Sequence, residues 1–156
     1  MTRINSSVAV RLLTDEHLLA EHREIKRIPS VYKKRLDSKL GFYIPDKFTL
    51  GQGHVLFFID KAAYTLGRYM SLHEECLLRG FNVQDYSENW NVYNSDDNDF
   101  IMNDHIPTKE EYEQIRDRIC QRITNSTKKS WHYYGKPITI IEAINLLYNV
   151  YSDCYV

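Results

Sequence analysis

The sequence HLLAEHREIKR, residues 17–27, decides how the rest of the chain is arranged. Thr14 can cap a helix that runs through this stretch, and Asp15 and Glu16 would place carboxylates at its positive N-terminal end. Successive helical residues turn by about 100°, so each side of the helix collects residues of a different kind. One face is polar and consists of Glu16, Ala20, Arg23, Glu24 and Arg27. Another face is apolar and consists of Leu18, Ile25 and Ile28.

The polar face has a composition that suits a ligand carrying phosphates. Two arginines flank a carboxylate, and the small side chain of Ala20 leaves room for a ligand to approach. Such a face can bind phosphates on both sides of a chemical centre. A solvated amphipathic helix has the same pattern, because ion pairs between residues four apart are common and contribute only roughly a few tenths of a kcal/mol each. The pattern alone therefore leaves both interpretations open.

Length and composition indicate one globular domain over residues 1–156. Hydrophobic residues make up 43% of the 156, enough for a core of the chain's own. The three cysteines lie far apart without metal-binding spacing, which is typical of reduced thiols in a cytoplasmic protein. The first 15 residues lack the apolar centre of a signal peptide, and no apolar run approaches membrane-spanning length. We therefore expect a cytoplasmic location, or the host cytoplasm if the source is viral.

The charge of the chain is unevenly distributed. Its net value of -1 argues against a generally basic nucleic-acid binder. Residues 1–50, however, hold ten Lys and Arg against six Asp and Glu (+4), residues 81–120 hold three against ten (-7), and residues 121–140 hold four against none (+4). A local basic surface is compatible with this pattern, as is charge balancing within one fold.

Apolar spacing and capping signals predict a mainly α fold. Residues 81–106 are expected to form a long irregular connection between helices. Two later helices would begin with capping boxes, Thr108 with Glu111 and Thr139 with Glu142. The expected helices span residues 14–28 (ending before Pro29), 31–36, 54 or 60 to 79, 108–123 and 139–151.

Residues 128–136, KKSWHYYGK, combine lysines with aromatic side chains. Interleaved aromatics and cations suit base stacking together with phosphate contact. Aromatic side chains that tie a surface segment to a core would give the same composition, so this segment also has two interpretations.

No metal-binding pattern is present near the first helix. His17 and His22 are five residues apart, which places them about 140° apart around a helix. Metalloprotease motifs instead put two histidines four apart on one face. We therefore expect no metal site here.

The N-terminal amine is the most reactive group that the sequence offers. Removal of Met1 before the small residue Thr2 would expose an α-amine, which ordinarily titrates near a pKa of about 8. Nearby cations from Arg3, Arg23 and Arg27 would lower that pKa further. A neutral amine beside a carboxylate can form an imine, with its general acid/base at hand.

Several ungapped stretches, in order along the chain, resemble the phage pyrimidine-dimer DNA glycosylases with lyase activity, of the endonuclease V type. The resemblance implies a compact, single-domain helical fold whose N-terminal segment threads between helices. Residues 137–156 extend beyond the compact members of the family, and we expect them to form an extra C-terminal helix. The matching stretches are MTRIN (1–5), HLxAEHRExxR (17–27), GxGHVxFFxDK (51–61), ECLxRGFN (75–82), QR (121–122) and YYGK (133–136).

The same resemblance implies a reaction and its residues. The α-amine of Thr2 would attack the sugar C1′ of a damaged nucleotide and displace the base, with Glu24 as the acid/base residue. The partner would be damaged double-stranded DNA, and no metal ion or organic cofactor would be needed. We expect a monomer that does not bind a membrane. The residues implied to bind DNA are Arg3, Glu16, His17, Arg23, Arg27, Arg118, Trp131, Tyr133, Tyr134 and Lys136.

Three departures from the family's pattern keep alternatives open. Glu16 stands where well-known members have glutamine, and Gln114 stands where an arginine is usual one turn before Arg118. Residues 130–134 have one aromatic missing or shifted. The alternatives are the same chemistry on another lesion or on abasic sites, and a noncatalytic DNA-binding protein of the same fold.

Overall fold

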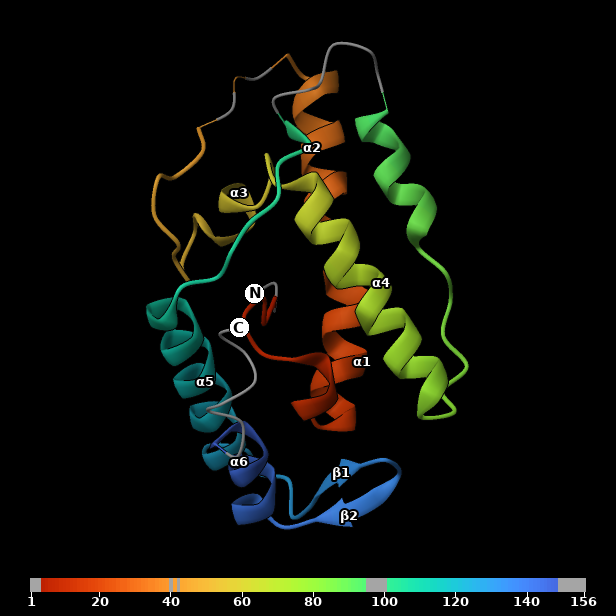
Figure 1. The fold of residues 1–156 in the computed structure, drawn as a ribbon, viewed down its shortest axis with the longest axis vertical. Coiled ribbons are helices and arrows are strands. Elements are labelled where there is room, and N and C mark those ends of the chain that lie inside the picture. Colours follow the sequence, from red (N-terminus) through yellow and green to blue (C-terminus); the bar gives the residue numbers. More distant parts are fainter. Residues whose placement is uncertain (1–3, 40, 42, 95–100, 149–156) are drawn as a thin grey trace.

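The computed structural model describes residues 4–39, 41, 43–94 and 101–148 of the chain. In Figure 1, helices α1 and α2 follow each other along the long axis and α4 crosses them, while α5 and α6 lie on the other side and a hairpin lies at one end. Within the described residues, six helices and one small hairpin confirm the expected mainly α fold. The elements are η1 (Val10–Leu12), α1 (Asp15–Glu24), α2 (Arg27–Asp37), α3 (His54–Phe57), α4 (Ala62–Leu78), η2 (Ser87–Tyr93), α5 (Lys109–Thr124), β1 (Trp131–Tyr133), β2 (Lys136–Ile138) and α6 (Ile140–Tyr148).

The N-terminal segment runs through the middle of the molecule, with α5 on one side and α1 and α4 on the other (Figure 1). Its apolar residues Ile4 and Val8 are completely buried in the common core. The segment is therefore enclosed by helices from Ile4 onward, as expected. Thr2 and Arg3 lie outside the described residues.

The first long helix differs from the prediction, which let it run to residue 28 and stop before Pro29. α1 ends at Glu24, and α2 begins at Arg27 and contains Pro29 near its start. Proline has no N–H to donate to the carbonyl four residues earlier, and that carbonyl belongs to Ile25. The amide of Ile28 donates to it instead, at 3.1 Å. Pro29 is tolerated in the first turn of α2, because amides there need no partner within the helix.

Capping residues begin the helices where the sequence indicates. Thr14 Oγ1 accepts from the amide of His17 at 3.3 Å, and Thr108 Oγ1 accepts from that of Glu111 at 3.2 Å. The Thr139–Glu142 pair is reciprocal, with the Thr139 amide donating to the Glu142 carboxylate at 2.7 Å and the Glu142 amide to Thr139 Oγ1 at 3.2 Å. The Glu111 carboxylate instead bonds His105 at 2.9 Å, so only half of that capping box forms.

The connection after α4 is more ordered than predicted. Within the expected irregular stretch 81–106, η2 forms a 3-10 helix that buries Trp90 and Tyr93. Three residues make one turn of a 3-10 helix, so these two aromatics point the same way. The indole N–H of Trp90 donates to Thr65 Oγ1 at 3.1 Å, and the ring of Tyr93 stacks on Tyr32 with centroids 4.6 Å apart. Residues 95–100 lie outside the described part.

The basic aromatic segment forms the hairpin. β1 and β2 pair antiparallel, with Trp131 opposite Ile138 and Tyr133 opposite Lys136. The two turn residues, Tyr134 and Gly135, have φ of 51° and 74°. Two successive positive φ values match the twist of a tight hairpin, which is why glycine suits the second position.

None of the described helices is long and apolar enough to cross a membrane.

The predicted helix beginning at residue 54 or 60 is divided, since α3 ends at Phe57 and α4 begins at Ala62. The last helix, α6, is described as far as Tyr148, and the expected continuation to Tyr151 lies outside the described residues.

Candidate functional site

The polar face of α1 is partly open to solvent, with Ala20 buried, whereas its apolar face is completely buried. The side chains of Arg23 and Arg27 are exposed and that of Glu24 is partly exposed. Ile25 and Ile28, on the apolar side, are completely buried. The helix thus presents a carboxylate between two cations, as its spacing predicts. The break between α1 and α2 places Arg27 on the helix that follows.

A cavity of about 750 Å³ lies beside this face. Its walls come from α1, from residues 82–86 after α4, and from residues 122–131, which run from the last turn of α5 to the start of β1. Glu24 is not among the lining residues, although its neighbour Arg23 is. The residues predicted to bind DNA that line the cavity are Glu16, His17, Arg23 and Trp131.

Two of these lining residues pack against each other. The rings of His17 and Trp131 stack with centroids 5.0 Å apart and planes 8° apart, and both side chains are buried. Thr14 Oγ1 holds His17 Nδ1 at 2.8 Å. This stack attaches the start of β1 to α1 and forms part of the cavity wall.

The acidic residue that departs from the family's pattern is engaged by the hairpin. The Glu16 carboxylate accepts from the backbone amide of His132 at 3.1 Å and lies 2.9 Å from His132 Nδ1, with Lys128 Nζ at 3.8 Å. Burial opposes ionisation, but the bonds from His132 and the charge of Lys128 outweigh it and lower the pKa of Glu16. The negative charge is therefore balanced within the protein.

The two hairpin tyrosines hold the hairpin to the body of the protein. The hydroxyl of Tyr133 donates to the backbone carbonyl of Arg11, and that of Tyr134 donates to the Glu75 carboxylate, both at 2.8 Å. The amides of Tyr134 and Gly135 donate to the two carboxylate oxygens of Asp15, at 3.1 and 2.8 Å. Lys136, the remaining predicted contact of this segment, is exposed.

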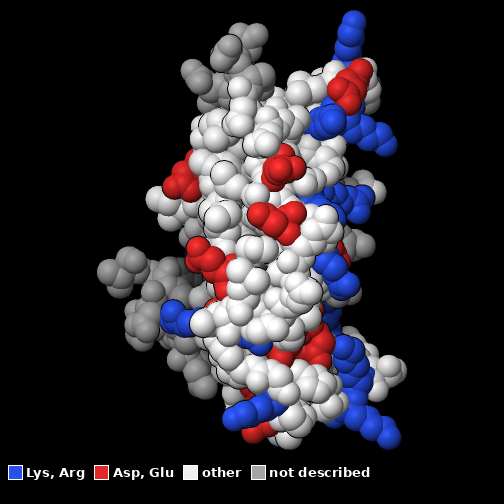
Figure 2. Space-filling view, turned by 90° about the vertical axis from the view of Figure 1, so that its right-hand side faces the viewer, with Lys and Arg blue, Asp and Glu red and all other residues white. Residues whose placement is uncertain are grey.

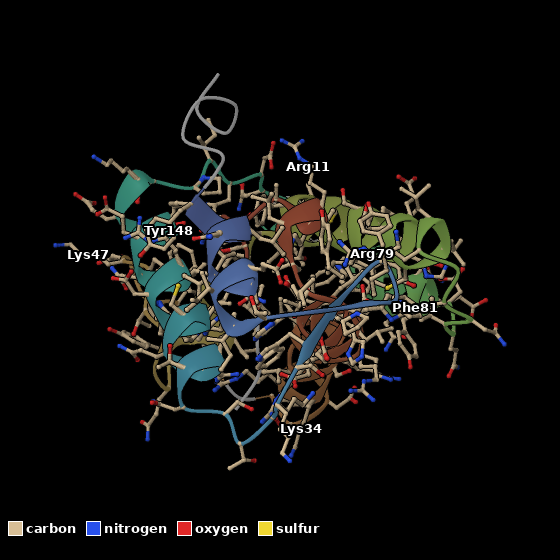
Figure 3. The ribbon with its side chains drawn as sticks, turned by 90° about the horizontal axis from the view of Figure 1, so that it is seen from below. Arg11, Lys34, Lys47, Arg79, Phe81 and Tyr148 are labelled. Atoms are coloured by element: carbon tan, nitrogen blue, oxygen red, sulfur yellow. The ribbon has the colours of Figure 1, made fainter. Side chains whose placement is uncertain are left out.

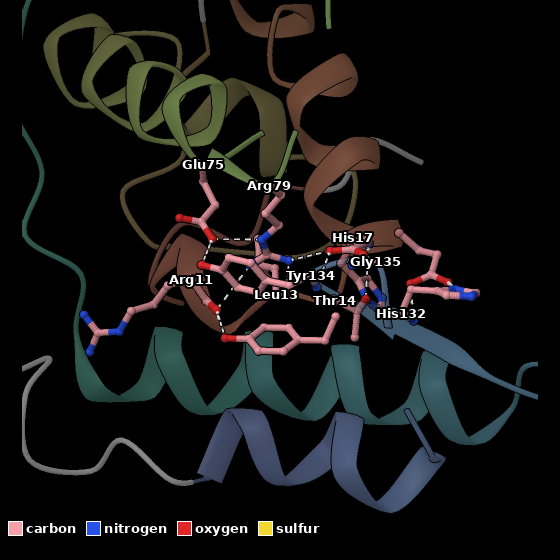
Figure 4. Close-up of polar contacts among 12 residues, drawn as sticks. Arg11, Leu13, Thr14, His17, Glu75, Arg79, His132, Tyr134 and Gly135 are labelled. Carbon is pink, nitrogen blue, oxygen red and sulfur yellow. Dashed lines mark hydrogen bonds and ion pairs between the residues drawn. The ribbon is translucent and has the colours of Figure 1, made fainter. Parts of the chain in front are cut away.

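Arg79, at the end of α4, is the centre of this attachment (Figure 4). Its side chain is completely buried and pairs with Asp15 and Glu75, at 2.8 Å in each case. It also donates to the carbonyl of Leu13 at 2.8 Å, and its guanidinium lies 4.5 Å from the centre of the Tyr134 ring. A cation placed between two carboxylates and a ring joins η1, α1, α4 and the hairpin at one point.

Arg118, from α5, lies inside the molecule. It is 9% exposed, and its Nη2 donates to the carbonyl of Ile4 at 3.0 Å and to Asn5 Oδ1 at 2.9 Å. The structure thus joins this residue to the N-terminal segment. Thr2 and Arg3, which the resemblance implies to act on DNA, lie outside the described residues. The next two residues, Ile4 and Asn5, are held by Arg118.

The sequence did not identify the whole cavity wall. Asn82, Gln84 and Tyr86 line it, yet they belong to residues 81–106, for which the sequence predicted only a long irregular connection. Arg122, another lining residue, appeared only as part of a matching motif. Asn82, Gln84 and Tyr86 share a position shortly after the end of α4, which sequence alone does not relate to α1. In the described part of the chain, no cluster of His, Cys, Asp and Glu could hold a metal ion.

Two buried histidines make stability depend on pH. Burial lowers the pKa of His54 to about 4 and, together with the neighbouring His73, that of His22 to about 4. Between these values and the ordinary value near 6.5, the unfolded chain binds protons that the folded protein does not. Stability should therefore fall as the pH falls from 7 to 5.

This dependence can be measured as the urea midpoint of unfolding at pH 7 and at pH 5. We expect a lower midpoint at pH 5. His54→Asn keeps a side-chain amide able to donate to the Thr49 carbonyl, which His54 Nδ1 meets at 2.8 Å, and it should make the difference between the two midpoints smaller. Equal midpoints for the unmodified protein at both pH values would contradict the prediction.

A family model described as pyrimidine dimer DNA glycosylase matches residues 1–89. This is more than half of the 156 residues. The matched part contains the N-terminal segment, the complete polar face of α1 and most of the cavity wall after α4. Arg118 and the hairpin come from the part beyond it.

Proposed function

The chain belongs to the pyrimidine dimer DNA glycosylase family, and from this membership we propose that it removes ultraviolet-type pyrimidine dimers from DNA through an imine. The amine would be that of Thr2, freed by removal of Met1. One observation carries the proposal: Arg23, which lies next to Glu24 on α1, lines a cavity of about 750 Å³, and Arg27 follows at the start of α2. The N-terminal segment, held at Ile4 and Asn5, runs against the same helix.

The proposed reaction has two stages. The α-amine adds to C1′ of the damaged nucleotide, the bond from C1′ to the base breaks, and the base leaves with a proton. The C1′–O4′ bond of the sugar ring then breaks as O4′ takes up a proton, and the nitrogen, which keeps its second hydrogen, forms the cationic imine with C1′. Glu24 then accepts a proton from C2′, the C3′–O bond breaks and the strand is cut, after which water releases the enzyme. A carboxylate serves both as the base and as a counter-charge to the imine.

The charge of the surface supports binding of a nucleic acid. Lys and Arg side chains gather along one edge of the face in Figure 2, while acidic side chains lie mainly in its middle. Exposed cations on α1, α2 and the segment before β1 supply such charge, among them Arg23, Arg27, Lys33, Lys34, Lys128 and Lys129. Phosphate binding of this kind fixes the position of a duplex without reading its sequence.

The cavity supports chemistry on a nucleotide taken out of the duplex. Glycosylases reach their target by extruding a nucleotide into a pocket, and the cost is lower at damaged sites. A volume of about 750 Å³ beside Arg23 gives space for such a nucleotide. Arginine at the rim and aromatic walls supply phosphate contact and stacking.

A second candidate is the same chemistry directed mainly at abasic sites. The contacts that the aromatic side chains of the hairpin already make within the protein favour this candidate. Trp131 is stacked on His17, and the hydroxyls of Tyr133 and Tyr134 bond other parts of the protein. Fewer aromatic groups are thus available to stack on a bulky lesion than the sequence suggests.

Three duplexes, with a pyrimidine dimer, with an abasic site and with no damage, separate these proposals when incubated with the protein and borohydride. We expect a covalent adduct with both damaged duplexes and none with the undamaged one. An adduct with the abasic duplex alone would favour the second candidate. Binding without any adduct would identify a noncatalytic DNA-binding protein.

Salt dependence tests the assignment of the DNA surface. With about four to six phosphate contacts, log affinity should fall with log salt at a slope of about -0.9 per contact. Arg23→Ala and Arg27→Ala should each flatten the slope by about one contact. Arg11→Ala is the matched control, because Arg11 is exposed and points to the opposite side of the molecule from Lys34 (Figure 3).

Lys34 marks the side on which Arg27 lies, since the two are seven residues, or about two turns, apart on α2. The slope measured for Arg11→Ala should equal that of the unmodified protein. Unchanged slopes for both Arg23→Ala and Arg27→Ala would place the DNA surface elsewhere.

A further inference from the structure

The start of the chain is held by polar side chains that have little contact with solvent. Arg118, from α5, donates through one nitrogen to both the carbonyl of Ile4 and the side chain of Asn5, at 3.0 and 2.9 Å. The side-chain amide of Asn5 in turn donates to the carboxylate of Glu21 on α1, at 2.9 Å. One asparagine is thereby fixed from two helices.

The carboxylate that receives Asn5 is itself paired. Glu21 is 0% exposed, and Arg68 of α4 binds it through two nitrogens, at 2.9 and 3.0 Å. Arg68 also donates to the carbonyl of Val8, and the hydroxyl of Tyr64 donates to the carbonyl of Ser6. Side chains from α4 and α5 therefore hold the carbonyls of residues 4, 6 and 8, while α1 holds the side chain of Asn5.

Stability alone is a weak explanation for this arrangement. Removing two charges from water is costly, and replacing a buried ion pair by apolar residues of similar volume is often neutral or stabilising. What a network of directed bonds supplies is one defined conformation. Here the conformation that it defines is the path of residues 4–8.

The path of residues 4–8 affects how the α-amine of Thr2 can approach the carboxylate of Glu24. Glu21, which holds Asn5, precedes Glu24 by three residues, or about 4.5 Å along the helix axis. Thr2 precedes Asn5 by three residues, and three residues of chain reach at most about 11 Å. The anchor point is therefore close enough to Glu24 for the α-amine to meet its carboxylate. Fixing the chain at Asn5 restricts the directions in which the amine can approach.

We propose that Arg118, Asn5, Glu21 and Arg68 are positioning residues, which aim the N-terminal amine at the nucleotide held beside Glu24. The inference rests on the proposed function. It assigns Arg118 a role different from the phosphate contact that the resemblance implies. A guanidinium that is 9% exposed and bonded to Ile4 and Asn5 acts on the reaction through the N-terminal segment.

The variant Arg118→Lys tests this role, because lysine keeps the charge but lacks the planar guanidinium that binds both acceptors. The two readouts are the single-turnover rate, with the protein in saturating excess over an abasic duplex, and the slope of log affinity against log salt. A misplacement of about 1 Å costs on the order of 100-fold in rate. We expect a loss of about that size, with the affinity and the salt slope unchanged.

Arg116→Lys is the matched control. Arg116 is on the same helix, pairs with Asp117 at 3.1 Å and lies against the ring of Tyr148, and it should retain both the rate and the slope. A slope that is flatter by about one contact in Arg118→Lys would show a phosphate contact and overturn the proposal. A rate equal to that of the unmodified protein would overturn it too.

Amide hydrogen exchange gives a readout that does not depend on activity. Exchange over residues 5–8 should accelerate in Arg118→Lys, while exchange within α2 stays unchanged. Asn5→Ala, which removes the bonds to Arg118 and Glu21 together, should show the same loss of rate and the same local exchange. It serves as the second variant if Arg118→Lys does not fold. Unchanged exchange over residues 5–8 in a folded variant would overturn the proposal.

Failure of the two proposals can be told apart. If the unmodified protein forms no adduct with any duplex, the proposed function is wrong. If it forms the adduct and the folded Arg118→Lys and Asn5→Ala variants form it equally fast, the proposed function stands and the positioning role is wrong.

Discussion

Glu24→Gln is expected to abolish strand cleavage while leaving the affinity for damaged DNA unchanged or higher. Glutamine has nearly the shape of glutamate, but its amide can neither accept the proton removed in the elimination nor balance the cationic imine. Binding depends on cations such as Arg23 and Arg27, which remain exposed. Loss of a negative charge from a surface that meets phosphates favours binding.

Two quantities must be measured on the same damaged duplex, the affinity by gel shift and the rate of cleavage. Glu74→Gln is a suitable control, because it makes the same change at an exposed position of α4. It should alter neither quantity. Near-normal cleavage by Glu24→Gln would refute the mechanism. Loss of binding together with cleavage would show that the residue has a structural role.

The second large effect concerns the nucleophile. Borohydride during turnover should leave DNA attached to the peptide that begins at Thr2, and blocking the α-amine by selective acylation should abolish the adduct. Thr2→Ala should retain the reaction, because the amine and not the threonine side chain forms the imine. Intact mass before the experiment establishes that Met1 has been removed.

Lysines are the competing nucleophiles, and they differ in availability. Lys61 Nζ donates to the Phe57 carbonyl at 2.7 Å and to Asp60 at 2.8 Å, whereas Lys136 is exposed on the hairpin. An adduct that maps to Lys136 alone, with the blocked amine still active, would exclude Thr2 as the nucleophile.

Local signals were sufficient to predict most helices. Thr14, Thr108 and Thr139 cap the starts of α1, α5 and α6. The hydroxyl of each accepts a hydrogen bond from the amide three residues later, so the signal is local. The polar and apolar sides of α1 were also predictable, since they follow from spacing alone. The sequence indicated correctly that Pro29 interrupts the helix, but it predicted the end at residue 28. The break instead lies around Ile25, whose carbonyl accepts from the amide of Ile28.

Long-range contacts were beyond local signals. The pattern around Trp131 fits both a stacking surface and a packed aromatic, and only the position of His17 shows that the two rings stack. Arg118 looks like any arginine on an amphipathic helix until Ile4 and Asn5 are placed next to it. Trp90 became part of the core because Thr65 of α4 lies beside it. Such partners are far apart in sequence, and no local rule relates them.

The docking of the hairpin onto α1 also sets an order of events during synthesis. Asp15 receives the amides of Tyr134 and Gly135 from 119 and 120 residues later in the chain, and the carbonyl of Ile4 receives Arg118 from 114 residues later. While a ribosome is still making the first hundred residues, none of these bonds can exist. Contacts of such sequence separation form late, because a long loop must close first. A nascent chain thus carries the amine and Glu24 long before it can orient them, and becomes competent only after Arg118 has been synthesised and has folded onto Ile4 and Asn5.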